Sequence, residues 1–186
     1  MRKLLFGLVL SMLATSAMAT SWLVEPYLGY SLISGNRGIK DIKGTGMQFG
    51  GRVGVNIAIF SAGLLYDKTR TDSIKFEGAN SKGAATINNG GLFVLAALPL
   101  VGLRAWGSYF LISRVVGRKA GGEIVTDGSK YGGDGLGIGL GLKLPIIPLA
   151  FNVEYRRFSY DKKDWANGDP AHMSLVSVTL SAPLTF

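Results

Sequence analysis

Residues 135–144 read Gly-Leu-Gly-Ile-Gly-Leu-Gly-Leu-Lys-Leu, a stretch in which every second residue is Leu or Ile. Successive side chains of a β-strand point to opposite faces, so the aliphatic residues share one face and the glycines the other. A soluble strand with one buried face usually carries large polar side chains on its other face. Glycines there indicate a crowded interior, where large side chains of neighbouring strands need space. The stretch therefore predicts one strand of a closed β-barrel with an apolar outer face.

The same two-residue period recurs along the chain and predicts eight strands. Each is close to the length of about ten residues that a tilted strand needs to cross a membrane. In the fourth strand both faces are equally apolar, so its register stays open. The sequence thus predicts an all-β fold, an eight-stranded antiparallel up-and-down transmembrane β-barrel. The expected strands are 22–34, 46–58, 60–69, 85–97, 101–113, 134–144, 148–158 and 172–186.

The expected connections alternate in length. Those at 58–61, 98–101 and 145–148 are short and uncharged, whereas the other four are long, polar and rich in glycine. Outer-membrane barrels have short periplasmic turns and longer extracellular loops. We therefore expect the long loops to be extracellular and both termini to be periplasmic.

Five charged side chains lie in the middle of the expected strands, and all five take the inward parity. A Lys or Arg on the lipid-facing side at mid-depth costs about 2–4 kcal/mol, which explains why these charges avoid it. We interpret the set as an ion-pair network that fills a narrow lumen, so that loss of Arg52 or Arg104 leaves an acid unpaired and destabilises the fold. A soluble lipocalin-like barrel would need the opposite polarity. The five residues are Glu25, Arg52, Arg104, Lys143 and Glu154.

The first residues have the three parts of a secretory signal peptide. Arg2 and Lys3 precede an apolar run, and Ala17-Met18-Ala19 supplies the small residues of a cleavage site. The apolar run is too short to span the membrane as a helix. We expect 1–19 to be removed and 20–186 to form one barrel domain. The absence of cysteine excludes disulfides, a zinc–thiolate site and a cysteine nucleophile.

Three segments resemble the OmpA/OmpX-type outer-membrane β-barrel proteins: Val24-Glu25-Pro26-Tyr27-Leu28-Gly29-Tyr30, Leu103-Arg104-Ala105-Trp106-Gly107-Ser108-Tyr109 and the terminal Phe186. The resemblance covers 20–186 and implies the same small barrel. It also implies that Phe186 is part of a signal read by the barrel-assembly machinery, and that partner exchange in the lumen network would open a small water path. Unlike OmpA, the sequence shows no peptidoglycan-binding segment after the barrel, so no cell-wall-anchoring role is expected.

The chain is basic, with a net charge of +8, and basic residues are in excess in each long loop. For an exported chain the expected anionic partners are membrane lipids and lipopolysaccharide phosphates, and nucleic acid is not expected. Ordinary solvation of the loops explains the charges equally well. The residues expected to contact lipopolysaccharide are Lys40, Lys43, Lys68, Arg70, Arg118, Lys119, Arg157, Lys162 and Lys163.

Two motifs near the end of the chain were weighed for chemistry. His172 and Ser174 fall on one strand face, as in lipid A deacylases that use a His-x-Ser pair with a Glu, but no acid follows Asp169 to orient the ring. Four oxygen-bearing side chains resemble calcium ligands, yet basic residues interrupt them and no bidentate Glu closes the pattern. Neither a catalytic residue, a metal nor a cofactor is expected. The four oxygen-bearing side chains that were compared with calcium ligands are Asp161, Asp164, Asn167 and Asp169.

Taken together, these features predict a non-enzymatic bacterial outer-membrane barrel with a structural or surface-interaction role. A narrow passive pore and a lipid A-modifying enzyme are the two alternatives. The expected oligomeric state is a monomer.

Overall fold

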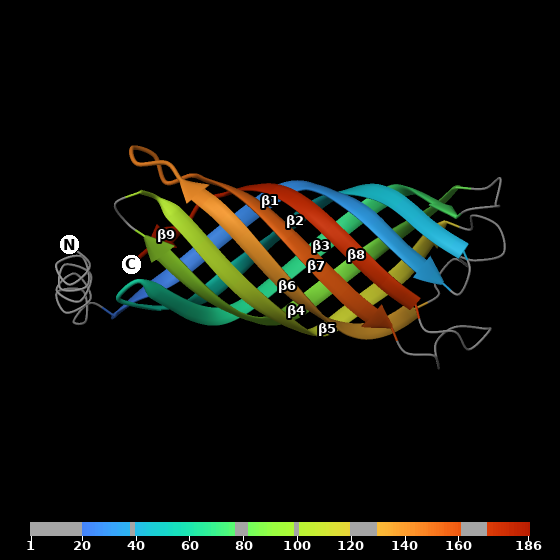
Figure 1. The fold of residues 1–186 in the computed structure, drawn as a ribbon, viewed down its shortest axis with the longest axis horizontal. Helices are drawn as coiled ribbons and strands as arrows, with labels where there is room; N and C mark the ends of the chain where they lie inside the picture. The colour runs from blue at the N-terminus through green and yellow to red at the C-terminus, as the bar shows by residue number, and fades with distance from the viewer. Residues whose placement is uncertain (1–19, 38–39, 77–81, 99–100, 120–129, 161–170) are drawn as a thin grey trace, which may run out of the picture.

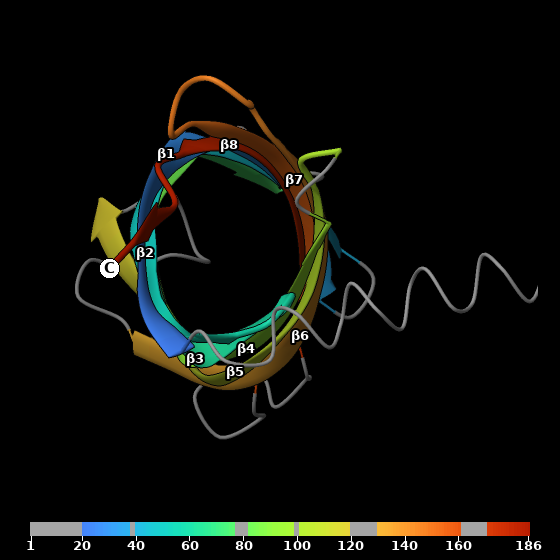
Figure 2. The same ribbon diagram turned by 90° about the vertical axis from the view of Figure 1, so that its left-hand side faces the viewer.

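The computed structural model describes residues 20–37, 40–76, 82–98, 101–119, 130–160 and 171–186, which form a closed antiparallel barrel (Figure 1, Figure 2). Neighbouring strands in the sequence pair with one another, and β8 pairs with β1 to close the sheet. The predicted all-β, eight-stranded barrel is confirmed. No helix among the described residues is long and apolar enough to cross a membrane. The strands are β1 (Thr20–Arg37), β2 (Lys40–Ile57), β3 (Phe60–Phe76), β4 (Lys82–Leu98), β5 (Leu103–Lys119), β6 (Lys130–Lys143), β7 (Ala150–Tyr160), β8 (Ala171–Ser181) and β9 (Leu184–Thr185).

The short element β9 continues β8 after a proline break and keeps its register against β1. Pro183 has no N–H to donate to the ladder, and neither has Pro26 on the facing strand. The carbonyl of Pro26 still accepts a hydrogen bond from the Ala182 N–H at 3.0 Å. Beyond the break, Phe186 and Trp22 exchange two backbone hydrogen bonds of 2.9 and 3.1 Å. Eight strand positions therefore make up the barrel, and the C-terminus lies beside the start of β1.

The two ends of the barrel differ. At the end that holds the C-terminus and the start of β1, here called the terminal end, a turn at Ala58–Ile59 joins β2 to β3, and 144–149 join β6 to β7 (Figure 1). At the opposite end, the far end, the long connection expected after the first strand is wrong. β1 runs to Arg37 and β2 starts at Lys40. A second apolar cluster, Ile42 of β2 with Ile74 of β3 and Ala85 of β4, supports the pairing of β2 and β3 beyond their predicted bounds.

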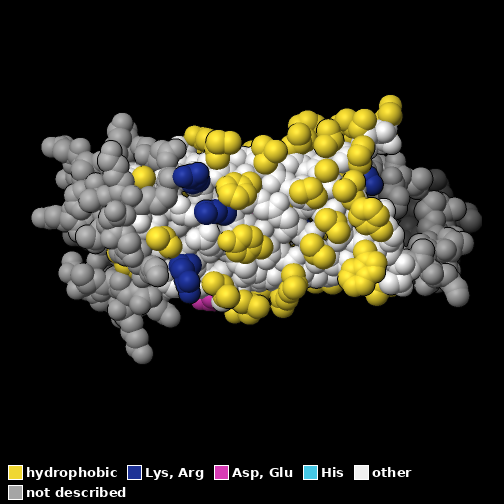
Figure 3. All heavy atoms as spheres, turned by 180° about the vertical axis from the view of Figure 1, so that it is seen from behind, with side chains coloured by type: hydrophobic (Ala, Val, Ile, Leu, Met, Phe, Trp, Pro, Cys, Tyr) yellow, Lys and Arg dark blue, Asp and Glu magenta, His cyan; other side chains and the backbone are white. Residues whose placement is uncertain are grey.

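The outer wall of the barrel is apolar. On β6, Leu136, Ile138, Leu140 and Leu142 are each about half to two-thirds exposed, as the alternation predicted. Figure 3 shows hydrophobic side chains spread over the wall in a broad belt. On β4 the structure decides the open register, because Leu92 is exposed and Phe93 is buried.

The interior is less polar than predicted. Besides charged groups it holds a continuous apolar cluster that includes Phe93, Phe110, Phe158 and Leu175. An eight-stranded barrel leaves only enough room for its own side chains, so large rings can fill it as well as charges do. The expectation of a polar and charged filling is therefore incomplete.

The glycine face of β6 is where these large side chains fit. A Cβ added at Gly139 would overlap the ring of Trp106, and one at Gly135 would lie 2.5 Å from the Phe158 ring. The prediction that glycines mark a crowded interior is confirmed at these positions.

Candidate functional site

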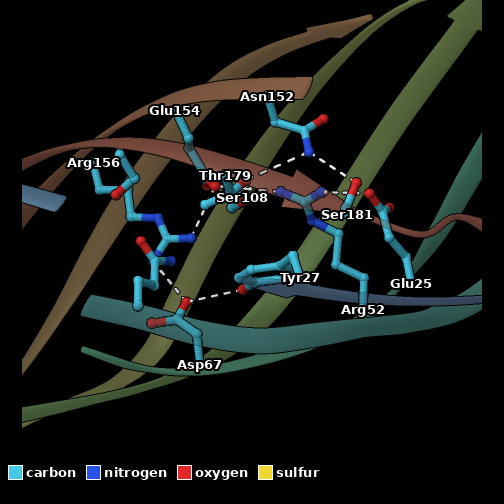
Figure 4. A network of polar contacts seen from close by, with 12 residues as sticks. Glu25, Tyr27, Arg52, Asp67, Ser108, Asn152, Glu154, Arg156, Thr179 and Ser181 are labelled. Carbon is cyan, nitrogen blue, oxygen red and sulfur yellow. Dashed lines mark hydrogen bonds and ion pairs between the residues drawn. The ribbon is translucent and has the colours of Figure 1, made fainter. Parts of the chain in front are cut away.

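Six charged side chains from five strands meet inside the barrel, and Figure 4 shows five of them. Their side chains are at most 5% exposed. Three are basic and three acidic, and the ion pairs join them in strictly alternating order. The set therefore carries no net charge when all six are ionised. In order along this charge chain the residues are Arg104, Glu25, Arg52, Glu154, Arg156 and Asp67.

The half of the charge chain nearer the terminal end is built on Glu25 of β1. Nη2 of Arg104 donates to both carboxylate oxygens of Glu25, at 2.6 and 2.5 Å. Arg52 lies between two acids, with Nη1 3.5 Å from Glu25 and Nη2 3.3 Å from Glu154. Glu25 and Arg52 are register partners on β1 and β2, so the sheet itself sets them side by side. Glu25 is thus shared by two guanidinium groups.

The other half is built on Arg156 of β7, which is 1% exposed. Its Nη2 donates to Glu154 at 2.8 Å and its Nη1 to Asp67 at 2.6 Å. When the Gln48 amide oxygen faces the guanidinium, it accepts from both terminal nitrogens at 3.0 and 2.9 Å. The ring of Phe110 lies 5.0 Å from the guanidinium carbon. One arginine is therefore held by two carboxylates, an amide and an aromatic face.

Neutral groups complete the solvation of Asp67. Tyr27 donates its hydroxyl to Oδ2 at 3.2 Å, and Asn89 donates its amide to Oδ1 at 2.9 Å. The oxygen of Asn89 in turn accepts from Ser113 at 2.8 Å. Buried charges are tolerated when opposite charges and hydrogen bonds satisfy them, and Asp67 has both.

Trp106 of β5 packs against the arginines of the first half. The guanidinium carbon of Arg52 lies 4.2 Å from its ring centroid, and that of Arg104 lies at 5.6 Å. Arginine over an aromatic face is favourable, more so when water is excluded. Because the indole lies over Gly139, the glycine of β6 is part of the same arrangement. The charge chain, its aromatic walls and the glycine face form one packed unit.

The structure brings together four of the five predicted lumen residues: Glu25, Arg52, Arg104 and Glu154. Lys143 is the exception, and its assignment to the network is wrong. It lies at the end of β6, is exposed, and lines a cavity of about 590 Å³ at the terminal end. Its inward parity is correct, but the strand ends there and leaves the ammonium near water.

Asp67 and Arg156 are functional-site residues that the sequence reasoning missed. The expected strands 60–69 and 148–158 end only a few residues beyond them, so neither is among the five mid-strand charges that the sequence predicts for the lumen. The signal that identifies them is parity. Asp67 alternates with exposed Tyr66 and half-buried Lys68, and Arg156 alternates with exposed Tyr155 and Arg157.

The His-x-Ser pair considered for catalysis is not formed. Nδ1 of His172 lies 3.2 Å from the hydroxyl of Ser159 on β7, whereas Ser174 lies 3.1 Å from the Tyr155 hydroxyl. Within the part of the chain that the structure describes, no group of three His, Cys, Asp or Glu side chains could hold a metal ion. The four oxygen-bearing residues weighed for calcium, between 161 and 169, lie outside the described residues.

The predicted lipopolysaccharide contacts fall into three groups. Lys43, Arg70 and Arg157 are exposed and Lys68 is half-buried, all with outward parity at the far end. Lys40, Arg118 and Lys119 lie in strands, but their side chains are outside the described set, as are residues Lys162 and Lys163 altogether. The side chain of Phe186, the predicted assembly signal, is 75% exposed at the terminal end.

Two solved structures resemble this geometry. Neisserial surface protein A matches with a TM-score of 0.58 and 12% identity, over 88% of this chain and 98% of that one. The chain has the fold of the small outer-membrane β-barrels of the OmpA/OmpX type. Ail, the attachment invasion locus protein of Yersinia pestis, in complex with the heparin analogue sucrose octasulfate, matches with a TM-score of 0.54 and 10% identity, over 88% of this chain and 99% of that one. No protein-family model and no curated protein sequence matches the chain.

Proposed function

We propose that the chain is a non-enzymatic barrel of the bacterial outer membrane with a plugged lumen and a structural or surface-interaction role. One observation carries this proposal. A wall of exposed apolar side chains encloses a charge-balanced network that is almost fully buried. A wall of that kind suits acyl chains, and an interior of that kind favours a plug over an open water path.

The outer wall supports a membrane location. Monomeric soluble proteins rarely expose apolar patches larger than a few hundred Å². Here large hydrophobic side chains are exposed on all eight of the long strands, for example Leu32 on β1, Leu64 on β3 and Val178 on β8. A closed barrel also satisfies every backbone ladder without a free sheet edge, which is the condition for a β-structure in lipid. By analogy with barrels of known orientation, the terminal end is assigned to the periplasm and the far end to the cell surface.

The packing of the lumen supports a plug over a pore. Arg156 and Glu25 are at most 1% exposed, and Phe110 and Phe158 pack together with ring centroids 5.1 Å apart. Water could pass only if several ion pairs exchanged partners together. Each exchange leaves a charge briefly unpaired in a site of low polarity, which is costly.

The outward polar residues support a binding role over a catalytic one. Lipopolysaccharide phosphates are the proposed partners of the basic far end, through charge-assisted hydrogen bonds. The barrel-assembly machinery is the proposed reader of Phe186 during biogenesis. His172 contacts the hydroxyl of Ser159 and not that of Ser174, and no carboxylate among the described residues is bonded to the imidazole to orient it as a general base.

Electrophoresis and bilayer recording test the membrane barrel and its plug. Refolded protein should migrate differently before and after boiling, float with phospholipid vesicles, and give no steady conductance in a planar bilayer. Reproducible single-channel steps would contradict the plugged lumen and show that the barrel is a pore. Loss of an acyl chain from lipid A incubated with the protein, detected by mass spectrometry, would replace the binding role by an enzymatic one.

Single cysteines test the orientation, since the chain has none of its own. A membrane-impermeant maleimide should label Asn36→Cys in intact cells, because Asn36 is exposed near the far end. Ile146→Cys, at a position 93% exposed at the terminal end, should be labelled only after the outer membrane is permeabilised. The reverse pattern would invert the assignment.

A further inference from the structure

Three basic side chains gather on one side of the outer wall, near the far end of β3 and β5. Lys68 on β3 pairs in register with Asn88 on β4, and Asn88 pairs in register with Arg114 on β5. Adjacent strands lie about 4.8 Å apart, so the backbones of Lys68 and Arg114 are about 10 Å apart with Asn88 between them. Arg70 occupies the next outward position along β3. The long side chains of all three can reach one small anion above Asn88.

A β-bulge places Arg114 in this group. The inward residues of β5 alternate from Arg104 as far as Phe110, and continued alternation would turn Arg114 into the lumen. The pairing of β5 shifts register between Phe110 and Ser113, and Leu111 and Ile112 are both exposed. The extra residue reverses the parity beyond it, so Ser113 points inward and Arg114 outward. The irregularity in β5 is thus what turns the side chain of Arg114, the third cation, to the outer wall.

The register neighbours of Lys68 and Arg70 on β2 are apolar, and exposed Asp134 on β6 lies one outward position from the register partner of Arg114. The register neighbours on β2 are Phe49 beside Lys68 and Met47 beside Arg70, which are 49% and 63% exposed. Tyr66 and Ile112, 58% and 60% exposed, lie one outward position nearer the membrane centre. Figure 3 shows Lys and Arg side chains at the border of the hydrophobic belt on one face of the wall. A cation at such a border can extend its charge to the headgroup level while its stem contacts acyl chains.

The three cations have no carboxylate partner within the described part of the chain, where the ion pairs join lumen residues only. Asn88 is held by the Tyr66 hydroxyl, which donates to its Oδ1 at 3.4 Å. That contact leaves the amide N–H groups of Asn88 directed away from Tyr66 and available to an acceptor. The group therefore offers three positive charges and an amide donor to a ligand.

We propose that Lys68, Arg70, Arg114 and Asn88 form a binding site for a phosphate group of an outer-leaflet glycolipid of the lipopolysaccharide class. The inference rests on the proposed membrane location and deepens it by assigning the lipid partner to one side of the wall. Phosphate suits the site because each of its oxygens can accept a short charge-assisted hydrogen bond. The apolar neighbours Phe49, Met47 and Ile112 select a phosphate attached to acyl chains over a soluble anion, since they would contact those chains.

Native mass spectrometry of the refolded protein, titrated with bisphosphorylated lipid A, tests the site. The wild type should retain one lipid A, and retain dephosphorylated lipid A far more weakly. Lys68→Gln/Arg114→Gln should bind bisphosphorylated lipid A at least about tenfold more weakly, because each basic residue near a charged lipid surface contributes a factor of about five. The matched control is Lys143→Glu, which lowers the net charge by the same two units at an exposed position at the terminal end and should bind as the wild type does.

The outcomes separate this inference from the proposed function. Equal weakening of Lys68→Gln/Arg114→Gln and of the Lys143→Glu control would show a net-charge effect and overturn the local site. Retention of sucrose octasulfate but not of lipid A by the wild type would assign the cations to a soluble polyanion and overturn the lipid. Heat-dependent migration and flotation with vesicles that lack lipid A report the membrane barrel independently. If heat-dependent migration and flotation persist while lipid A binding is absent, the proposed phosphate site is wrong and the proposed membrane barrel is unaffected.

Discussion

Nη2 of Arg104 lies 2.6 and 2.5 Å from the two carboxylate oxygens of Glu25, although 79 residues separate them in the sequence. Both side chains are almost fully buried, and Arg52 is the only other cation paired with Glu25 in the described structure, at 3.5 Å. Arg104 is therefore the main charge partner that stabilises the buried Glu25 carboxylate. The pair ties β1 to β5 across the lumen, a connection that no backbone ladder makes.

Arg104→Ala should destabilise the barrel by about 3–5 kcal/mol, because it leaves a buried carboxylate with one distant partner. Urea unfolding in lipid vesicles, followed by tryptophan fluorescence, measures the change. Lys143→Ala removes a charge from an exposed position on the neighbouring strand and should change the free energy of unfolding by less than about 0.5 kcal/mol. Equal effects of the two substitutions would show that the Arg104–Glu25 contact adds nothing.

Replacing both Glu25 and Arg104 should lower the free energy of unfolding less than replacing Arg104 alone. In Glu25→Gln/Arg104→Met the lumen keeps its volume and loses the unpaired charge, so part of the stability lost in Arg104→Ala should return. The same unfolding experiment provides the comparison. A double variant that is less stable than Arg104→Ala would mean that packing, not charge, dominates at this position.

Arg156→Lys should lower the free energy of unfolding by about 2 kcal/mol. An ammonium lacks the planar set of donors with which the guanidinium hydrogen-bonds Asp67, Glu154 and Gln48 at the same time. The adjacent Arg157→Lys is the control, because Arg157 is exposed on the outer wall and pairs with no acid in the described part of the chain. It should be within about 0.5 kcal/mol of the wild type. The two substitutions are chemically identical, so any difference reports the face of β7 on which each side chain lies.

Gly139→Ala should destabilise the barrel by about 1–3 kcal/mol, because the added methyl group overlaps the Trp106 ring and the tryptophan is held by two arginines. Gly107→Ala is the matched control. A Cβ at Gly107 meets no atom within 4 Å, so that substitution should be neutral or slightly stabilising. Trp106 fluorescence should also shift in Gly139→Ala and stay unchanged in Gly107→Ala.

The two-residue period was enough to predict the barrel and most of its faces. It succeeded on β6 and β7, where apolar residues alternate with glycine or with polar groups, and it placed Glu25, Arg52 and Arg104 inside. The reason is physical, because a charge and an acyl chain exclude one another at mid-depth. On β4 the period failed, since Leu92 and Phe93 are equally apolar and only packing against other strands separates them.

The remaining misses come from strand ends and irregularities. Lys143 has inward parity but lies where the strand ends. Asp67 and Arg156 were left out of the predicted lumen charges because they lie near the predicted ends of strands that continue further. The bulge in β5 leaves no mark in the hydrophobic pattern, because Leu111 and Ile112 fit either face. Parity carries no information once an extra residue is inserted, so the outward direction of Arg114 required the pairing register.

Cysteine scanning across the bulge provides the last prediction. A regular strand would give alternate labelling, but the register shift predicts inward, outward, outward and inward for residues 110 to 113. In a refolded barrel, a fluorophore on Leu111→Cys or Ile112→Cys should be quenched by bromine-labelled lipid. Phe110→Cys and Ser113→Cys should label poorly until the protein is unfolded, because both positions are fully buried. Strict alternation through these four positions would return Arg114 to the lumen, and with it the third cation of the proposed phosphate site would be lost.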